Sequence, residues 1–269
     1  MHRPRKRFGQ HFLHDSASIE RIVAAIAPER GQHMVEIGPG LGALTAPLLN
    51  RLGKLHAVEI DRDAIRHLQE RYGASGLVLH QADVLEFRLI TLAPTAALRL
   101  VGNLPYNIST PLLFHLLRQR EHILDMHFML QKEVVARMAA TAGEDAYGRL
   151  SVMLAPWTSV EPLFDIGPSA FRPPPQVHST FVRLRPYAQP AVNIAEPASF
   201  AAVVAAAFAQ RRKTLRNALR PLLSEVQIRS AGIDPGARAE VIPPAGFAAL
   251  ADVLTAAKRA AEGCAYPLE

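Results

Sequence analysis

Between residues 34 and 185 the chain alternates short apolar runs with amphipathic stretches of helical spacing. Short apolar runs bounded by turn residues indicate buried strands. The alternation is typical of an α/β fold, a mostly parallel sheet with helices on both faces. Such sheets bind ligands beyond the carboxyl ends of the strands, where the strand order switches. The predicted strands are 34–37, 55–60, 77–80, 98–101 and 126–130, and the predicted helices lie near 41–52, 62–72 and 111–117.

The composition changes after this alternating region. Two more strand-like runs occupy 160–164 and 180–184, and a stretch with three prolines then leads to residue 198. From there alanine, leucine, arginine and glutamine dominate, which favours helices. We therefore predict a small all-helical domain behind the α/β domain. The predicted divisions are an N-terminal arm at 1–16, the α/β domain at 17–186, a linker at 187–197 and the helical domain at 198–269.

The excess positive charge lies in two segments. The formal net charge is +6, and residues 1–16 and 198–269 each carry a net +3 while the stretch between them is neutral. Clustered cations attract nucleic acid through counterion release, although a solvated arm or helix face is an equally simple interpretation. The candidate RNA-binding residues are Arg5, Lys6, Arg7, Arg211, Arg212, Lys213 and Arg216.

Cysteine content and hydropathy bound the cellular setting. The single cysteine, Cys264, allows no intrachain disulfide and no multi-cysteine metal site, which indicates a reducing compartment. The longest apolar run, 200–209, is half of the roughly 20 residues that span a bilayer, and the basic N-terminus lacks an apolar signal core. We expect a soluble cytoplasmic protein without a membrane partner, and no metal site.

A glycine-rich loop follows the first predicted strand. The sequence EIGPGLG at 36–42 places Glu36 before Gly38 and Gly40. Glycines let the backbone approach a ligand closely, although a plain strand-to-helix turn remains an alternative. The spacing is GxGxG rather than GxGxxG, and Glu36 would repel a pyrophosphate. The loop therefore favours a ligand with a positive centre over a nicotinamide dinucleotide.

Two more acidic residues follow the next two predicted strands. Glu59, followed by Ile60, stands 21 positions after Gly38, the distance at which a carboxylate commonly binds ribose hydroxyls. A helix-capping role for Glu59 is the alternative. Asp83, followed by Val84, comes after the third strand, where its carboxylate can accept from an adenine amine. The combined pattern resembles the S-adenosylmethionine site of Rossmann-like methyltransferases.

The fourth predicted strand ends in the sequence Asn103-Leu104-Pro105-Tyr106. A proline-led turn is the simple interpretation. An adenine amine, however, is a poor nucleophile whose lone pair is drawn into the ring. An amide oxygen and a backbone carbonyl beside a proline can accept its two protons, and so aim that lone pair at a methyl donor. A tyrosine ring can stack on the extruded base.

These motifs together resemble one family over most of the chain, from about Lys6 to about residue 240. The family is the small-subunit ribosomal RNA adenine dimethyltransferases, class I methyltransferases with a small helical C-terminal domain. The supporting segments, besides the glycine loop and the NLPY turn, are KRFGQHFL (6–13), FMLQKEV (128–134), AYGRLSV (146–152), FRPPPQVHS (171–179) and QRRKTLRNAL (210–219).

The resemblance implies roles for individual residues. Gln10, His11 and Leu13 would close over the methionine half of S-adenosylmethionine, and Phe171 would face Tyr106 across the target base. A buried hydrophobic plug is the alternative role for Phe171. The other implied cofactor-binding residues are Gly38, Gly40, Glu59, Ile60, Asp83, Val84 and Asn103, and the implied catalytic residues are Asn103, Leu104, Pro105, Tyr106 and Phe171.

The resemblance also implies a substrate. It is two adjacent adenosines in the 3′-terminal hairpin loop (helix 45) of 16S rRNA, dimethylated on their N6 amines in the immature 30S subunit late in assembly by a monomeric enzyme. Single-stranded loop bases are what proteins usually recognise in RNA. The alternatives are an adenine methyltransferase of 23S rRNA or DNA, and a nonenzymatic RNA-binding assembly factor.

Overall fold

The computed structural model describes residues 11–93, 96–210 and 212–263, and side chains up to residue 260. The chain forms two compact units. The first comprises residues up to Val135 together with Val160–Pro186, and the second comprises Ala136–Ser159 together with the chain from Tyr187. The predicted division differs from these units at residues 136–159, which the sequence analysis places in the α/β domain and which pack with the second unit.

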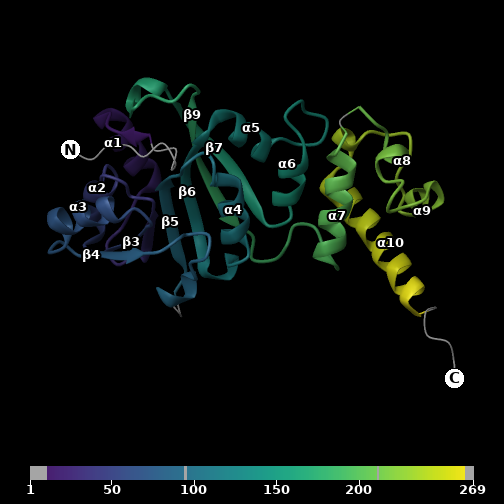
Figure 1. The fold of residues 1–269 in the computed structure, drawn as a ribbon, viewed down its shortest axis with the longest axis horizontal. Coiled ribbons are helices and arrows are strands. Elements are labelled where there is room, and N and C mark those ends of the chain that lie inside the picture. The colour runs from purple at the N-terminus through teal and green to yellow at the C-terminus, as the bar shows by residue number, and fades with distance from the viewer. Residues whose placement is uncertain (1–10, 94–95, 211, 264–269) are drawn as a thin grey trace. The chain divides into compact units, whose positions relative to one another are not determined.

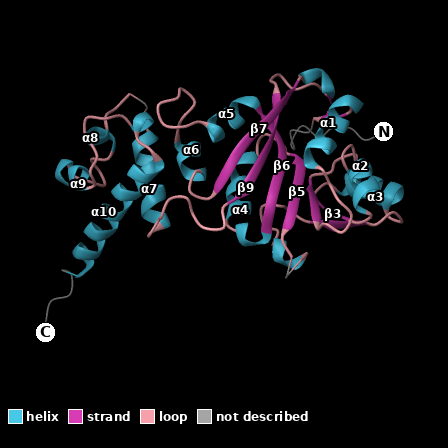
Figure 2. Ribbon diagram, turned by 180° about the vertical axis from the view of Figure 1, so that it is seen from behind, coloured by secondary structure: helices cyan, strands magenta, loops and turns pink. Residues whose placement is uncertain are grey.

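The first unit is built on a seven-stranded sheet in the order β4-β3-β2-β5-β6-β9-β7. The neighbours from β4 to β6 are parallel, and β9 runs antiparallel to β6. Figure 2 shows β7 and β9 at one side of the sheet. The predicted α/β fold is confirmed. The strands are β2 (Met34–Ile37), β3 (Leu55–Glu59), β4 (Leu77–Gln81), β5 (Leu98–Asn103), β6 (Ile123–Gln131), β7 (Thr158–Ile166) and β9 (Ser179–Pro186).

Helices precede, follow or connect most of the parallel strands (Figure 1). Asp15 caps α1 by accepting from the backbone N–H of Ser18 at 2.8 Å, and Asp61 caps α3 through the N–H of Asp63 at 3.0 Å. Gly53 ends α2 in the left-handed conformation that glycine tolerates. The helices are α1 (Ser16–Ile26), α2 (Thr45–Leu52), α3 (Arg62–Tyr72), α4 (Ser109–Leu117) and α5 (Lys132–Ala139).

The order of the strands reverses at β2: β3 and β4 lie on one side of it, and β5 and β6 lie on the other. Strands β2 and β5 approach closely there, because a Cβ atom on Gly102 would lie 2.5 Å from the backbone oxygen of Ile37. Every residue of β2 is buried, because a central strand is covered on both faces. The carboxyl ends of β2, β3 and β5 therefore meet at one place, where the fold class places its ligands.

A short strap crosses over these strand ends. The strap is residues 11–13, and it includes β1 (Phe12–Leu13), which pairs antiparallel with β8 (Phe171–Arg172). The pairing places Leu13 opposite Phe171. Beyond the strap, the backbone N–H of His14 donates to the Ala170 carbonyl at 3.0 Å. These bonds hold the N-terminal segment against the edge of the first unit.

The second unit is helical, as predicted for the C-terminal domain. Its core includes Phe200 and Phe247, both fully buried. Tyr147 and Val152 join the same core, and the Tyr147 hydroxyl donates to the Ile242 carbonyl at 2.8 Å. This contact explains why 136–159 belongs to this unit. Its helices are α6 (Arg149–Leu154), α7 (Pro197–Phe208), α8 (Leu215–Ala218), α9 (Glu225–Ser230) and α10 (Pro244–Gly263).

Within the described ranges, no helix combines the length and the apolar character that crossing a bilayer requires.

Candidate active site

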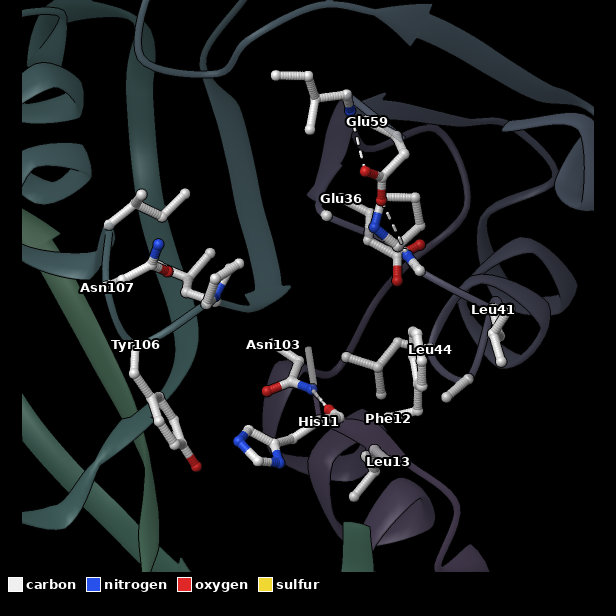
Figure 3. Close-up of a pocket in the computed structure, with 18 residues that line it drawn as sticks. His11, Phe12, Leu13, Glu36, Leu41, Leu44, Glu59, Asn103, Tyr106 and Asn107 are labelled. Atoms are coloured by element: carbon white, nitrogen blue, oxygen red, sulfur yellow. Dashed lines mark hydrogen bonds between the residues drawn. The ribbon is translucent and has the colours of Figure 1, made fainter. Parts of the chain in front are cut away.

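A pocket lies in the first unit where the strap meets the carboxyl ends of β2, β3 and β5 (Figure 3). Most of its wall is apolar, and two carboxylates and two carboxamides lie among the apolar groups. The lining residues are His11, Phe12, Leu13, Glu36, Gly38, Pro39, Gly40, Leu41, Ala43, Leu44, Glu59, Ile60, Asn103, Leu104, Pro105, Tyr106, Asn107 and Ile108.

The glycine loop forms one wall because its backbone takes conformations that side chains disfavour. Gly38 and Gly40 have φ values of +63° and +54°. A Cβ on Gly40 would lie 3.1 Å from the Phe12 ring, so the strap packs directly on the loop. The backbone of the glycine loop therefore lies directly at the pocket, as the sequence predicts.

Glu59 ends β3 with its carboxylate inside the pocket. One oxygen accepts the Gly40 N–H at 3.2 Å, and the other accepts the N–H groups of Ile60 and Asp61 at 2.9 Å each. Burial raises the pKa of Glu59, and these hydrogen bonds oppose that rise. A carboxylate has about four acceptor positions, and three are taken, so Glu59 retains about one for a ligand hydroxyl. Ile60 beside it is exposed and offers an apolar surface.

Glu36 lies deeper in the same pocket. Its carboxylate is buried and accepts a 2.6 Å hydrogen bond from the Thr45 hydroxyl. Burial raises the pKa of Glu36 from 4.5 to about 7, because the low-dielectric interior disfavours the charged form. A cationic ligand would favour the ionised form, in agreement with the positive ligand centre that the sequence predicts.

We expect Glu36→Gln to stabilise the protein at alkaline pH. The folded-state pKa of Glu36 lies above its unfolded value, so stability from this group is present below pH 4.5 and is lost as pH rises through 7. Relative to wild type, the variant should gain about 3 kcal/mol of unfolding free energy between pH 4.5 and 8, at about 1.4 kcal/mol per pKa unit. Urea denaturation of the variant and of wild type at pH 4.5 and pH 8 measures this gain. An equal difference in unfolding free energy between the two proteins at both pH values would contradict it.

Asn103, the last residue of β5, presents its carboxamide to the pocket. The side-chain nitrogen donates to the His11 carbonyl at 2.8 Å. Since a carbonyl can only accept, this bond identifies the carboxamide nitrogen as the atom that faces His11. The Asn103 oxygen is left as an acceptor on the side of Tyr106, as Figure 3 shows. Leu104 and Pro105 continue the pocket wall after Asn103.

Tyr106 stands across from the strap. Its hydroxyl shares a 2.8 Å hydrogen bond with the Ser179 hydroxyl on β9, and burial raises its pKa. The bond fixes the ring, which presents a face to His11 with the ring centroids 5.5 Å apart. The Tyr106 ring is therefore anchored through its hydroxyl.

Three predicted site residues lie elsewhere. Asp83 and Val84 do not line the pocket; Asp83 is exposed, and its carboxylate accepts from the Leu85 N–H at 2.9 Å. Phe171 is only 2% exposed and belongs to the core beneath Leu13. Phe171 is therefore a hydrophobic plug in this structure, and its place across the target base from Tyr106 stays a prediction. Gln10 lies outside the described residues.

The predicted RNA-binding cations are also only partly described. Arg212 and Lys213 are exposed in the second unit. Arg216 is exposed there as well and pairs with Glu225 at 3.6 Å. Four of these cations lie outside the described residues, namely Arg5, Lys6, Arg7 and Arg211.

The pocket also contains residues that the sequence analysis missed. Phe12 packs over Gly40, and Thr45 binds Glu36. Asn107 and Ile108 extend the wall after the NLPY turn. The position of Asn107 directly after that turn is a signal that could have been used. No local pattern marks Thr45, because its bond to Glu36 depends on how α2 begins.

The residues present fit S-adenosylmethionine. The glycine loop, the Glu59 carboxylate and the buried Glu36 suit a ligand with hydroxyls and a positive centre. None of the described lining residues is a lysine or arginine, which would repel a sulfonium. The strand order with an antiparallel β9 and a pocket at the β2–β5 switch defines the class I methyltransferases.

Comparison with known proteins gives the family. The family model described as ribosomal RNA adenine dimethylase matches residues 1–256. The ribosomal RNA small subunit methyltransferase A of Thiobacillus denitrificans is 55% identical over 93% of this chain and 97% of its own length. That of Pseudomonas aeruginosa is 52% identical over 94% and 95%. The chain belongs to the ribosomal RNA adenine dimethylase family, and it is an S-adenosylmethionine-dependent enzyme that dimethylates adenine in rRNA.

Solved structures agree on the fold. The 23S rRNA methyltransferase ErmE superposes with a TM-score of 0.69 at 24% identity, covering 91% of this chain and 99% of that one. A dimethyladenosine transferase from Plasmodium falciparum superposes with a TM-score of 0.71 at 23% identity, covering 89% and 96%. These likenesses concern the fold alone.

Proposed function

We propose that this enzyme dimethylates the N6 amines of two adjacent adenosines in the 3′-terminal hairpin loop, helix 45, of 16S rRNA, in the immature 30S subunit late in assembly. The names of the curated relatives, small subunit methyltransferases, support this choice of subunit. Family membership supports adenine as the target base.

The observation that carries the proposal is the orientation of Asn103. Because its amide nitrogen is bound to the His11 carbonyl, its oxygen is the acceptor available to an incoming amine. We assign one amine proton to that oxygen and the other to the Leu104 carbonyl. Accepting both protons draws the nitrogen lone pair out of conjugation and stabilises the positive charge that develops on the nitrogen. A monomethylated amine keeps one proton and a lone pair, which allows a second transfer.

The pocket supplies positioning rather than acid–base chemistry. Bound S-adenosylmethionine provides an already activated methyl group on a sulfonium, so alignment accounts for most of the rate. We assign the ribose hydroxyls to Glu59, which lines the pocket together with Ile60, and the cofactor adenine to Asp83 and Val84 beside Ile60. Gly38, Gly40 and Leu13 would lie against the rest of the cofactor, and Tyr106 would stack on the target base.

Methyl transfer from labelled S-adenosylmethionine tests the proposal. The acceptors are undermethylated small subunits, naked 16S rRNA, large subunits and DNA. We expect two methyl groups on each of two adenosines in the small subunit, and little transfer to the others. Preferred labelling of large subunits or DNA would replace the proposal with a 23S rRNA or DNA methyltransferase. The shared fold with the 23S rRNA methyltransferase makes the large subunit a necessary arm.

The second unit is the proposed RNA contact. Arg212 and Lys213 are exposed and lie in the most basic segment of that unit. The double variant Arg212→Gln/Lys213→Gln should weaken subunit binding and reduce the slope of log K against log salt by about 1 to 2. The matched control is Lys258→Gln/Arg259→Gln, which removes two exposed charges from α10 of the same unit. Equal salt slopes for the two double variants would contradict the assignment.

We also propose that the enzyme acts as a monomer in the cytoplasm. Its rRNA substrate supports the cytoplasmic assignment. Light scattering after gel filtration measures the monomer mass directly.

A further inference from the structure

The ring of His11 covers one face of Tyr106 at the entrance for the target base. The two ring centroids are 5.5 Å apart with an interplanar angle of 30°, which is a stacked pair. Figure 3 shows the His11 ring beside the Asn103 carboxamide, between Tyr106 and Leu13. An aromatic ring therefore already occupies the position next to the acceptor oxygen that holds the amine.

The side chain and the backbone of His11 are held by different bonds. The ring nitrogen Nδ1 lies 2.8 Å from the Pro173 carbonyl, and because a carbonyl only accepts, Nδ1 donates. The backbone carbonyl of His11 instead accepts from Asn103. The ring can therefore leave Tyr106 by breaking the Pro173 bond, while Asn103 and the pairing of β1 with β8 keep the backbone in place.

The spacing excludes a base between the two rings. Carbon atoms of rings in contact are about 3.5 Å apart, so a base between two rings needs about 7 Å between them. The observed 5.5 Å leaves no room. A base that stacks on this face of Tyr106 must displace the His11 ring.

We propose that the His11 ring is a stand-in for the target base: it fills the base subsite on Tyr106 and swings out when the adenine enters. This inference rests on the proposed role of Tyr106 as the stacking platform. The displaced ring gives up one hydrogen bond and one stacking contact, and the incoming base must compete with both. His11 thereby sets the affinity for the base, and a base that stacks poorly cannot displace it.

The steady-state KM for undermethylated small subunits measures this competition. We expect His11→Ala to lower KM three- to tenfold, because the base no longer displaces a ring. His11→Asn should behave in the same way, since it keeps a donor for Pro173 but has no ring. The matched control is His14→Ala, on the same segment, where the side chain is exposed and KM should stay unchanged. The dissociation constant of S-adenosylmethionine, measured for each variant, shows whether the strap is intact.

Hairpin RNAs give a second readout that needs no methyl transfer. One hairpin carries adenine at the target position, and the other carries an abasic nucleotide there. His11→Ala should tighten binding of the adenine hairpin three- to tenfold and leave the abasic hairpin unchanged. Equal effects on both hairpins, or none on either, would show that the ring does not compete with the base.

The opposite result also overturns the inference. A higher KM and weaker binding of the adenine hairpin in both His11 variants would make His11 a wall of the base site instead of its occupant. The substrate preference of the wild-type enzyme separates failure of the proposed function from failure of this inference. If the wild-type enzyme methylates large subunits instead, the adenine and abasic hairpins are taken from the loop of that substrate. Tighter binding of the adenine hairpin alone by His11→Ala would still support the inference, and any other result would overturn it.

Discussion

Asn103→Ala is expected to lose about a hundred- to a thousandfold in the rate of methyl transfer, the usual cost of removing one preorganised group that stabilises developing charge. The alanine cannot accept an amine proton, so the target nitrogen stays conjugated with its ring. S-adenosylmethionine should still bind within a few-fold of wild type, because Glu59 and the glycine loop are untouched. Single-turnover transfer to undermethylated subunits, with cofactor binding by calorimetry, separates the two effects.

The matched control for this variant is Asn107→Ala. Asn107 has the same side chain, lines the same pocket and is exposed at its rim. It should keep most of the activity. The Asn103 variant also loses the bond to His11, but β1 pairing and the His11–Pro173 bond still hold the strap. Wild-type turnover by Asn103→Ala would remove the basis of the proposed mechanism.

Arg99→Met is expected to destabilise the protein by about 3 to 5 kcal/mol, the cost of breaking a buried ion pair from one side. Arg99 is 8% exposed, and its guanidinium donates to both carboxylate oxygens of Asp125 at 3.0 to 3.2 Å. It also donates to the Ile26 carbonyl at the end of α1 at 2.7 Å. The methionine would leave Asp125 charged and buried, and that carbonyl unsatisfied.

Urea denaturation measures this loss, and the double variant Arg99→Met/Asp125→Asn is its control. Replacing the orphaned carboxylate by a neutral amide should recover part of the stability. In the wild-type protein burial lowers the pKa of neighbouring His127 to about 4, so this side chain is neutral at pH 7 beside Asp125. A loss below about 1 kcal/mol, typical of a surface pair, would contradict the buried-pair interpretation.

The strands were predictable because short apolar runs bounded by turn residues leave a direct trace in the sequence. The predicted runs 34–37, 55–60 and 77–80 agree with β2, β3 and β4 within one residue. The division into units was harder. Residues 136–159 look continuous with the α/β pattern, and only the packing of Tyr147 and Val152 against distant helices assigns them to the second unit.

The pocket was also predictable in part. Glu36, Glu59 and Asn103 stand at the ends of parallel strands, and parallel strands bring their carboxyl ends together. Asp83 follows β4, a strand at one edge of the sheet, and is not among the lining residues of the pocket, so its contact with the cofactor stays a prediction. Strand order, which sets how far each strand end lies from the switch, is not visible in any single strand.

The sequence by itself determined the α/β fold, the glycine loop and the residues that end the central strands, because periodicity and local backbone chemistry depend on neighbours along the chain. Only the tertiary structure decided that Phe171 is buried, that the Asn103 oxygen faces the pocket and that His11 stacks on Tyr106. Each of these depends on the strap, whose contacts join residues that lie far apart in the chain. No local sequence pattern predicts contacts between such distant residues.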